Sequence, residues 1–132
     1  MDIIVDTSVL IAVILNEPTK ASLVARTTGV TLLAPPSVHW EIGNALSAML
    51  KRRRINVTQA KLALTAYEQI PIRFTDAGLE QAVKLSDQLD IYAYDAYVLA
   101  AALNQSCPLL SLDRGLMHAA RSVGIIVVEV NQ

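Results

Sequence analysis

The hydrophobic pattern alternates short apolar runs with longer stretches of helical spacing. Residues 3–5 are a continuous β-branched run, which favours a strand buried on both faces of a parallel sheet over an alternating surface strand, and residues 31–34 predict a second short strand. Similar short runs at 71–74, 108–111 and 125–130 predict three more strands. Because helical stretches separate these strands, the pattern predicts a short parallel sheet covered by helices on both faces, a three-layer α/β/α architecture.

Capping residues, prolines and glycines mark the ends of the predicted helices. The Asp6-Thr7-Ser8 triplet offers side-chain oxygens to cap the first, Ser37 is expected to cap the third, and Thr75 with Asp76 the fifth. Gly124 is expected to end the last helix. The predicted helices cover approximately residues 7–15, 18–28, 38–54, 57–67, 75–89, 93–103 and 113–123.

Right-handed crossovers in such a sheet place the carboxyl ends of the strands at one edge. Ligand sites in open parallel sheets lie at that edge, where the strand order changes direction. No internal repeat or linker interrupts the pattern, so residues 1–132 are expected to form one domain with its functional site there.

Composition narrows the class of protein. The chain has 132 residues, 53% of them apolar, and its 12 acidic and 11 basic residues give a net charge of -1, which argues against a general electrostatic coater of nucleic acid. Cys107 is the single cysteine, so an intrachain disulfide and a thiolate zinc cluster are excluded and a cytoplasmic location is expected. The N-terminal stretch does not resemble a signal peptide, and no apolar run reaches the ~20 residues of a membrane span.

Four carboxylates stand at the start of helices or directly after strands. Asp6 follows the first strand, Asp113 follows the run 109–112, Glu41 lies about one turn into the long third helix, and Asp95 opens an apolar helix. The predicted topology brings all four toward one edge. Converging carboxylates repel and lose solvation, so a divalent cation is their natural partner, and an all-oxygen set favours Mg²⁺ or Mn²⁺ over Zn²⁺. Such sites catalyse phosphodiester hydrolysis with activated water.

Each carboxylate also has a purely structural interpretation. Asp6 and Asp113 can each be a simple helix cap, and Glu41 can be a first-turn acid that the helix dipole favours. Asp95 can likewise be a dipole-stabilised acid, although its apolar neighbours make an unpaired charge there expensive. The joint pattern of four is more informative than any one of them.

Basic and aromatic residues are candidates for contact with nucleic acid. The run of four consecutive cations at residues 51–54 is a candidate for phosphate contact, although a solvated helix end is the more common role of such a run. Tyr92, Tyr94 and Tyr97 are expected to pack or to line a loop, with stacking on an unpaired base as the functional alternative. The candidate phosphate contacts are Lys51, Arg52, Arg53, Arg54 and Arg114.

The order and spacing of these motifs resemble a PIN domain. The resemblance rests on Asp6-Thr7-Ser8 after the first strand, a glutamate near residue 40, Tyr94-Asp95-Ala96-Tyr97 at the start of an apolar helix, and Ser111-Leu112-Asp113 after a strand. It runs from the first strand to the last. Within that family the chain resembles the VapC toxins of type II toxin-antitoxin modules.

The resemblance implies a Mg²⁺- or Mn²⁺-dependent endoribonuclease that is homodimeric and is neutralised by a VapB-type antitoxin. It makes Asp6, Glu41, Asp95 and Asp113 the catalytic acids. Asp6 and Asp95 are then the principal metal ligands, and Asp113 is a third that acts directly or through bound water. Ser8 and Ser111 are supporting hydroxyls, Ser111 standing where members of the family often have threonine.

Two other classes of function stay open at this point. The first is a catalytically silent module that binds RNA or a protein partner, in which the acids only cap helices. The second is phosphoryl transfer of the receiver or haloacid-dehalogenase type. The latter needs an acid where this chain has Ser8, and a receiver needs a lysine that residues 111–114 do not supply. Phosphoryl transfer is therefore the less favoured of the two.

Overall fold

The computed structural model describes residues 1–130, and its centre is a four-stranded parallel sheet. The strands are β1 (Asp2–Val5), β2 (Thr31–Ala34), β3 (Ile72–Phe74) and β4 (Leu109–Leu110), in the spatial order β3-β2-β1-β4. β1 is central and pairs in parallel with both β2 and β4. Four of the five predicted strands and the parallel sheet are therefore confirmed.

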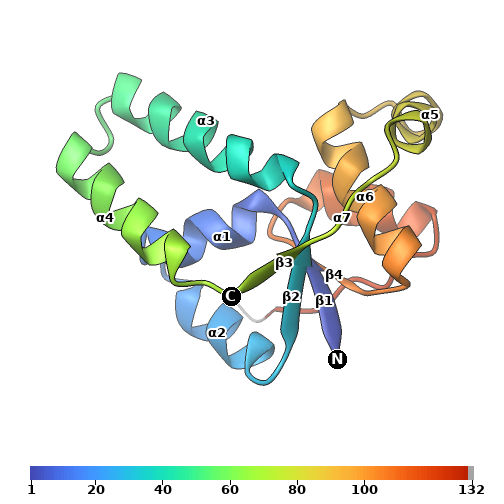
Figure 1. Ribbon diagram of the computed structural model, residues 1–132, viewed down its shortest axis with the longest axis horizontal. Coiled ribbons are helices and arrows are strands. Elements are labelled where there is room, and N and C mark those ends of the chain that lie inside the picture. Colours follow the sequence, from blue (N-terminus) through green and yellow to red (C-terminus); the bar gives the residue numbers. More distant parts are fainter. Residues whose placement is uncertain (131–132) are drawn as a thin grey trace.

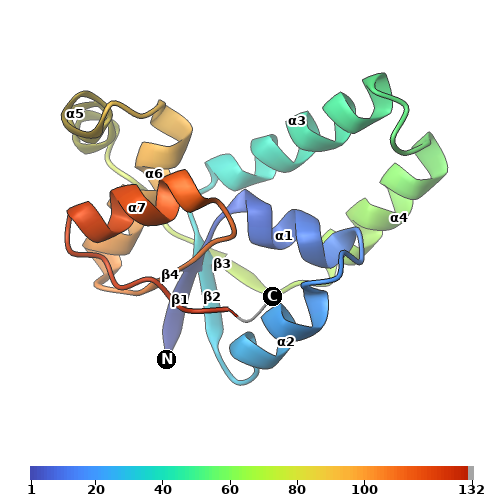
Figure 2. The same cartoon turned by 180° about the vertical axis from the view of Figure 1, so that it is seen from behind.

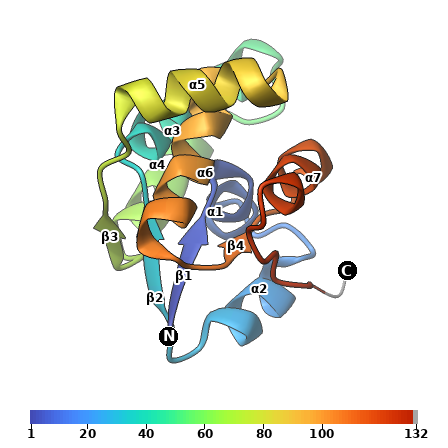
Figure 3. The ribbon, with the colours of Figure 1, turned by 90° about the vertical axis from the view of Figure 1, so that its right-hand side faces the viewer.

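Helices cover both faces of this sheet. On one side lie α1 (Thr7–Ile14), α2 (Lys20–Thr27), α3 (Ser37–Lys51) and α4 (Val57–Glu68). On the other side lie α5 (Leu79–Leu89), α6 (Ala93–Gln105) and α7 (Arg114–Ser122). Figures 1 and 2 show this division from opposite sides, and Figure 3 shows α6 packed across the sheet beside α7. The predicted three-layer α/β/α arrangement is confirmed. Within residues 1–130, every helix is too short or too polar to cross a membrane.

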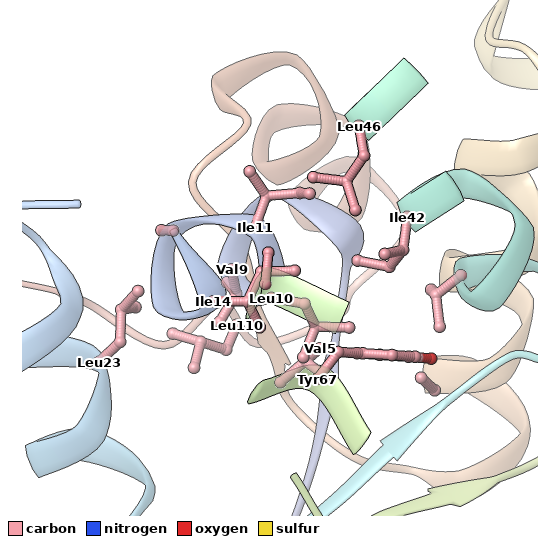
Figure 4. Packing of buried hydrophobic residues seen from close by; sticks show 14 of the residues in the cluster. Val5, Val9, Leu10, Ile11, Ile14, Leu23, Ile42, Leu46, Tyr67 and Leu110 are labelled. Carbon is pink, nitrogen blue, oxygen red and sulfur yellow. The ribbon is translucent and has the colours of Figure 1, made fainter. Parts of the chain in front are cut away.

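The central strand explains why the apolar runs do not alternate. Ile3 and Val5 pack into the cluster under α1 to α4, while Ile4 packs into the cluster under α5 to α7. Successive side chains of a strand point to opposite faces, so a strand covered on both faces is apolar at every position. Figure 4 shows Val5 among side chains of α1, α3 and α4, including Ile42 and Tyr67.

The prediction of a final strand over residues 125–130 was wrong. The segment forms one isolated bridge between Leu109 and Val127, in which the Leu109 N–H donates to the Ile126 carbonyl and the Val128 N–H donates to the Leu109 carbonyl, each at 2.8 Å. Its partner β4 has only two residues, and a ladder cannot extend further than the shorter of its two strands.

Two helix starts also differ from the prediction. α3 begins at Ser37 directly after Pro36, and the Ser37 hydroxyl makes no capping bond; proline presets the backbone angle for a helix start, so a side-chain cap is not needed. α5 begins at Leu79 rather than at Thr75, because Thr75 continues the sheet edge: its N–H donates to the Ala34 carbonyl at 2.9 Å.

α3 and α4 form an antiparallel hairpin that extends away from the sheet (Figure 1). Its tip, residues 51–56, turns through Arg53, whose φ of +56° lies in the left-handed region. Asn56 then starts α4 with a reciprocal capping box with Gln59. We call residues 51–56 the hairpin tip.

Candidate functional site

The carboxyl ends of β1 and β4 meet at the point where the strand order changes direction. From β1 the chain proceeds to β2 on one side, and β4 is later added on the other side. Asp6 comes directly after β1 and Ser111 directly after β4, so the topology brings together residues more than a hundred positions apart. This is the edge at which the sequence predicts the site. We call it the acidic edge.

Asp6 is fixed by hydrogen bonds to both of its carboxylate oxygens. Its Oδ1 accepts from Ser8 Oγ at 2.6 Å and from the Val9 N–H at 3.4 Å, and its Oδ2 accepts from Ser111 Oγ at 2.8 Å. The side chain is almost completely buried, with a residue exposure of 6%. Burial raises the pKa of Asp6 to about 6 in spite of these donors, and the charge of Asp113 adds a smaller increase.

The two serines connect Asp6 to the loop that follows β4. Each hydroxyl donates to Asp6 and accepts from a backbone N–H: Ser8 Oγ from Leu112 and Ser111 Oγ from Asp113, both at 3.0 Å. A hydroxyl that donates and accepts at once has one orientation. The start of α1 and the loop before α7 are therefore held together around the Asp6 carboxylate.

Asp113 makes one capping hydrogen bond, and its carboxylate has acceptor capacity left. It is the N-cap of α7, where its Oδ1 accepts from the Leu116 N–H at 3.1 Å, and it is exposed. The capping roles foreseen for Asp6 and Asp113 are thus both present. A carboxylate accepts about four hydrogen bonds or ligands, so capping leaves the Asp113 side chain able to bind something else.

Glu41 lies on α3 and faces the acidic edge with an unsatisfied oxygen. Because the helix begins at Ser37, Glu41 stands in the second turn rather than the first, and the helix dipole contributes little to its stability there. Its Oε1 and the hydroxyl of Thr7 are both buried without a hydrogen-bond partner among residues 1–130. Burial raises the pKa of Glu41 to about 7; the nearby Thr7 hydroxyl opposes this, and the charges of Asp95 and Asp6 add to it.

Asp95 lies in the first turn of α6, as predicted, and is half-buried. Burial raises the pKa of this carboxyl, and the negative charge of Asp113 raises it further. The four carboxylates therefore influence one another across the ends of two strands and four helices. A cation bound near them would relieve repulsion of this kind.

The donor set at the acidic edge fits a hard divalent cation bound largely through water. It consists of carboxylates and hydroxyls, and Glu41 Oε1 lacks a partner. Among residues 1–130, no three Asp, Glu, His or Cys side chains lie close enough to hold one ion together. Magnesium commonly takes one or two carboxylates and keeps several waters, so this spacing is compatible with it.

The predicted basic contacts fall into two places. Lys51, Arg52, Arg53 and Arg54 are exposed at the hairpin tip and form none of the ion pairs found within residues 1–130. Ten residues of helix separate Glu41 from Lys51, which is roughly 15 Å along the axis of α3. Arg114 instead opens α7 beside Asp113. The structure therefore brings Arg114 to the acidic edge, whereas the four cations of the hairpin tip lie away from that edge.

Sequence reasoning missed Thr7 as a member of the site. Its hydroxyl is buried at the first position of α1 and lowers the pKa of Glu41. The only signal was its position between Asp6 and Ser8, in the first turn of a capped helix. Contact with Glu41 depends on how α3 packs, which no local pattern predicts.

Comparison with known proteins identifies the family. The sequence model of the PIN domain matches residues 3–122, so the chain belongs to the PIN domain family and the predicted resemblance is confirmed. No curated protein is detectably similar in sequence.

Several solved structures share the fold. VapBC2 from Rickettsia felis, crystallised with a DNA fragment from their promoter, has a TM-score of 0.72 at 15% identity and covers 99% of this chain and 100% of its own. PAE2754 from Pyrobaculum aerophilum has a TM-score of 0.67 at 20% identity, with 97% and 92% covered. VapC20 from Mycobacterium tuberculosis, described as a sarcin-ricin loop cleaving toxin, has a TM-score of 0.63 at 15% identity, with 96% and 98% covered. At these identities the likeness establishes the fold.

Proposed function

We propose that this chain is a Mg²⁺- or Mn²⁺-dependent endoribonuclease that acts as the toxin of a toxin-antitoxin pair. The observation that supports this most directly is the acidic edge, where a buried, hydrogen-bonded Asp6 and three further carboxylates have mutually unfavourable charges. Membership of the PIN domain family and the structural likeness to VapC20, which is described as a sarcin-ricin loop cleaving toxin, give further support.

Each carboxylate has a role in this proposal. Asp6 and Asp95 are the principal ligands of the cation, Asp113 reaches it through bound water because no three such side chains within residues 1–130 lie close enough to hold one ion together, and Glu41 completes the site. A divalent cation bound there would supply Lewis-acid stabilisation and an activated water for phosphodiester hydrolysis. Ser8 and Ser111 act through Asp6, because their hydrogen bonds fix the direction of its carboxylate.

The basic residues attract and position RNA. Arg114 stands beside the acidic edge and is placed to contact the phosphate near the bond that is cut. The hairpin tip supplies a separate electrostatic contact, where Lys51, Arg53 and Arg54 line an open hollow of about 600 Å³ together with Asn56 and Gln59. An RNA strand that reaches from one to the other must extend along α3.

We expect the active form to be a homodimer. Trp40 on α3 is 69% exposed, and Leu79 and Val83 on α5 are also largely exposed. Leu79 and Val83 are four residues apart, so they lie on the same face of the helix. Large exposed apolar side chains on a small protein commonly belong to an interface, and a second copy of the chain is the partner that the proposed toxin needs.

The proposed VapB-type antitoxin has an apolar site available. Val9, Val13, Leu23, Val24 and Ile70 help to line a hollow of about 280 Å³ between α1, α2 and the start of β3. Such a hollow suits an aliphatic or aromatic side chain from an antitoxin segment. The fold is shared with VapBC2, whose structure includes promoter DNA, and the pair is proposed to work in the cytoplasm.

The test is to induce the protein in its host without its partner and to sequence the RNA ends that form. We expect new ends at a small set of positions, and none when Asp95→Asn replaces the native chain at the same protein level. Purified protein should generate the same ends only when Mg²⁺ or Mn²⁺ is added. Identical RNA ends from the native chain and the variant would contradict the proposal.

A second candidate is a catalytically silent module that binds RNA or a protein. It is favoured by one observation: Asp6 and Asp113 already serve as helix caps, so these two acids have a purpose without any metal. Titration with Mn²⁺ separates the candidates. A nuclease should gain melting temperature with the ion, and lose that gain in Asp95→Asn, whereas a silent module should show neither.

A further inference from the structure

A small hollow lies beside the acidic edge, at the carboxyl ends of β2 and β3. It has a volume of about 190 Å³ and is lined by Pro35, Pro36, Ser37, Asp76, Ala77 and Tyr97. We propose that this hollow binds one unpaired base of the RNA next to the bond that is cut, and that it prefers guanine. This inference rests on the proposed ribonuclease function and adds to it a base-recognition subsite.

The hollow is close to the acidic edge on three independent elements. Pro35 follows β2, which is the direct neighbour of the strand that carries Asp6, at an inter-strand spacing of roughly 5 Å. Ser37 stands one helical turn before Glu41 on α3, so these two side chains share a face of that helix. Tyr97 lies on another face of α6 than Asp95, roughly 3 Å further along the helix axis. The hollow therefore lies at the ends of the strand and helices next to the acidic edge, so a base bound in it would belong to the RNA segment that passes that edge.

The walls of the hollow are flat and rigid. Proline rings have little freedom, and Pro35 is among the most completely buried residues. The ring of Tyr97 packs edge-on against Tyr94, with centroids 6.2 Å apart and planes at 76°. Sequence-specific RNA recognition commonly places an unpaired base against such a ring. The volume is below the range of drug-sized pockets, so it suits a single base rather than a larger ligand.

Two polar groups give the hollow its chemistry. Ser37 lines the hollow, and its hydroxyl is buried without a hydrogen-bond partner among residues 1–130. Asp76 is exposed and forms none of the ion pairs within the same described part of the chain. Its loop is anchored at Thr75, which is bonded through its backbone to Ala34 and through its hydroxyl to Gln105, each at 2.9 Å.

The carboxylate of Asp76 determines which base is preferred. An ionised carboxylate only accepts hydrogen bonds. The Watson–Crick edge of guanine presents two adjacent donors, N1–H and the 2-amino group, which match its two oxygens. Cytosine and adenine present one amino group next to an acceptor nitrogen, and uracil presents one N–H between two carbonyl oxygens that repel a carboxylate. The expected order is guanine, then cytosine and adenine, then uracil.

The first test compares cleavage of a random RNA pool by the wild-type chain, Asp76→Asn and Asp90→Asn. Asp90 is an exposed acid at the end of α5 whose left-handed backbone accepts asparagine, so it controls for the loss of one charge. We expect wild type and Asp90→Asn to share a guanine preference at one position beside the cut. Asp76→Asn should lose that preference by about tenfold relative to Asp90→Asn. An unchanged guanine preference in Asp76→Asn overturns the inference.

The second test does not need catalysis. Guanosine 5′-monophosphate and uridine 5′-monophosphate are titrated without metal, and the backbone N–H signals of Ser37, Asp76, Ala77 and Tyr97 are followed by NMR. We expect these signals to move with the guanine nucleotide and to move much less with the uracil one. Guanine binding here without any RNA cleavage would refute the proposed function and keep the subsite. RNA cleavage with equal or no shifts from the two nucleotides would refute the subsite alone.

Discussion

The acidic edge and the hairpin tip carry opposite charges and are built in opposite ways. At the acidic edge, Asp6 is buried and both of its oxygens are bound by residues from two distant segments. At the tip, four consecutive cations are exposed and form none of the ion pairs within residues 1–130. One region fixes its central charged group by hydrogen bonds, and the other exposes its charged groups to solvent.

This difference matches the demands of chemistry and of attraction. A catalytic group must be held within a fraction of an ångström, so it needs packing and hydrogen bonds around it. A phosphate contact gains most of its energy from releasing counterions, which requires charge and access but little precision. We therefore expect substitutions at the edge to change rate and stability, and substitutions at the tip to change RNA affinity and its dependence on salt.

The largest effect is expected for Asp95→Asn. Loss of a partner that only supports a metal ligand already lowers activity or affinity by ten- to a hundredfold, so loss of the ligand itself should lower RNA cleavage by at least about a hundredfold. The measurement is the initial rate on a labelled RNA with Mn²⁺. Asp87→Asn, an exposed acid on α5, is the matched control and should retain the wild-type rate. Equal rates for the two variants would remove the acidic edge from the mechanism.

The next effect concerns stability and pH. Burial raises the pKa of Asp6 from 3.8 to about 6, so the metal-free folded state binds this proton more tightly than the unfolded state. The folded state is therefore favoured below pH 4, and this contribution is lost as the pH rises through about 6. A shift of this size corresponds to about 3 kcal/mol. Glu41, whose pKa is raised to about 7, acts in the same direction.

Asp6→Asn tests this directly. The amide still accepts from the Val9 N–H and cannot ionise, so without metal the variant should become more stable than wild type as the pH rises from 4 to 8. Chemical denaturation at several pH values measures the difference in the free energy of unfolding. Saturating Mn²⁺ should reverse the order at pH 8. A difference that stays constant over this pH range would show that the carboxyl of Asp6 titrates normally.

A smaller effect is expected for Ser111→Ala. The variant removes the donor to Asp6 Oδ2 and the acceptor for the Asp113 N–H, and an unpaired buried group costs about 1–3 kcal/mol. The loss should be greater at pH 8, where Asp6 is ionised, than at pH 4. Ser47→Ala, which removes only an exposed bond to the Asn44 carbonyl, should change stability little at either pH. Equal losses of unfolding free energy in the two variants would mean that the hydrogen bonds of Ser111 to Asp6 and Asp113 do not stabilise the site.

Local patterns were sufficient to predict most of the fold. The strands β1 and β2 and the capped start of α1 carry their signals in adjacent residues, and the structure confirms them. Residues 125–130 have a strand-like composition, but whether they pair depends on the length of β4, which is a property of a different segment. The start of α5 was misplaced for the same reason, since Thr75 bonds to the neighbouring strand.

The candidate site divides in the same way. Topology alone predicted that Asp6 and Asp113 meet at one edge, because both follow strands directly. Helix packing decided the rest: the separation of the hairpin tip from the edge, the contact of Thr7 with Glu41, and the hollow between β2, β3 and α6. None of these has a signal in consecutive residues. Charge patterns identify candidate groups, and the structure shows which of them can act together.

The smallest effect should come from the hairpin tip, in the double variant Lys51→Gln with Arg54→Gln. Each lost phosphate contact lowers the slope of log affinity against log salt by about 0.7 for single-stranded RNA, so two contacts should lower it by about 1.4. RNA binding is measured by fluorescence anisotropy between 50 and 200 mM salt in an Asp95→Asn background, which prevents cleavage. Arg26→Gln with Lys84→Gln removes the same charges from exposed sites on α2 and α5 and should leave the slope near its original value. If both double variants lower the slope equally, the protein attracts RNA by its overall charge, and the tip has no role of its own.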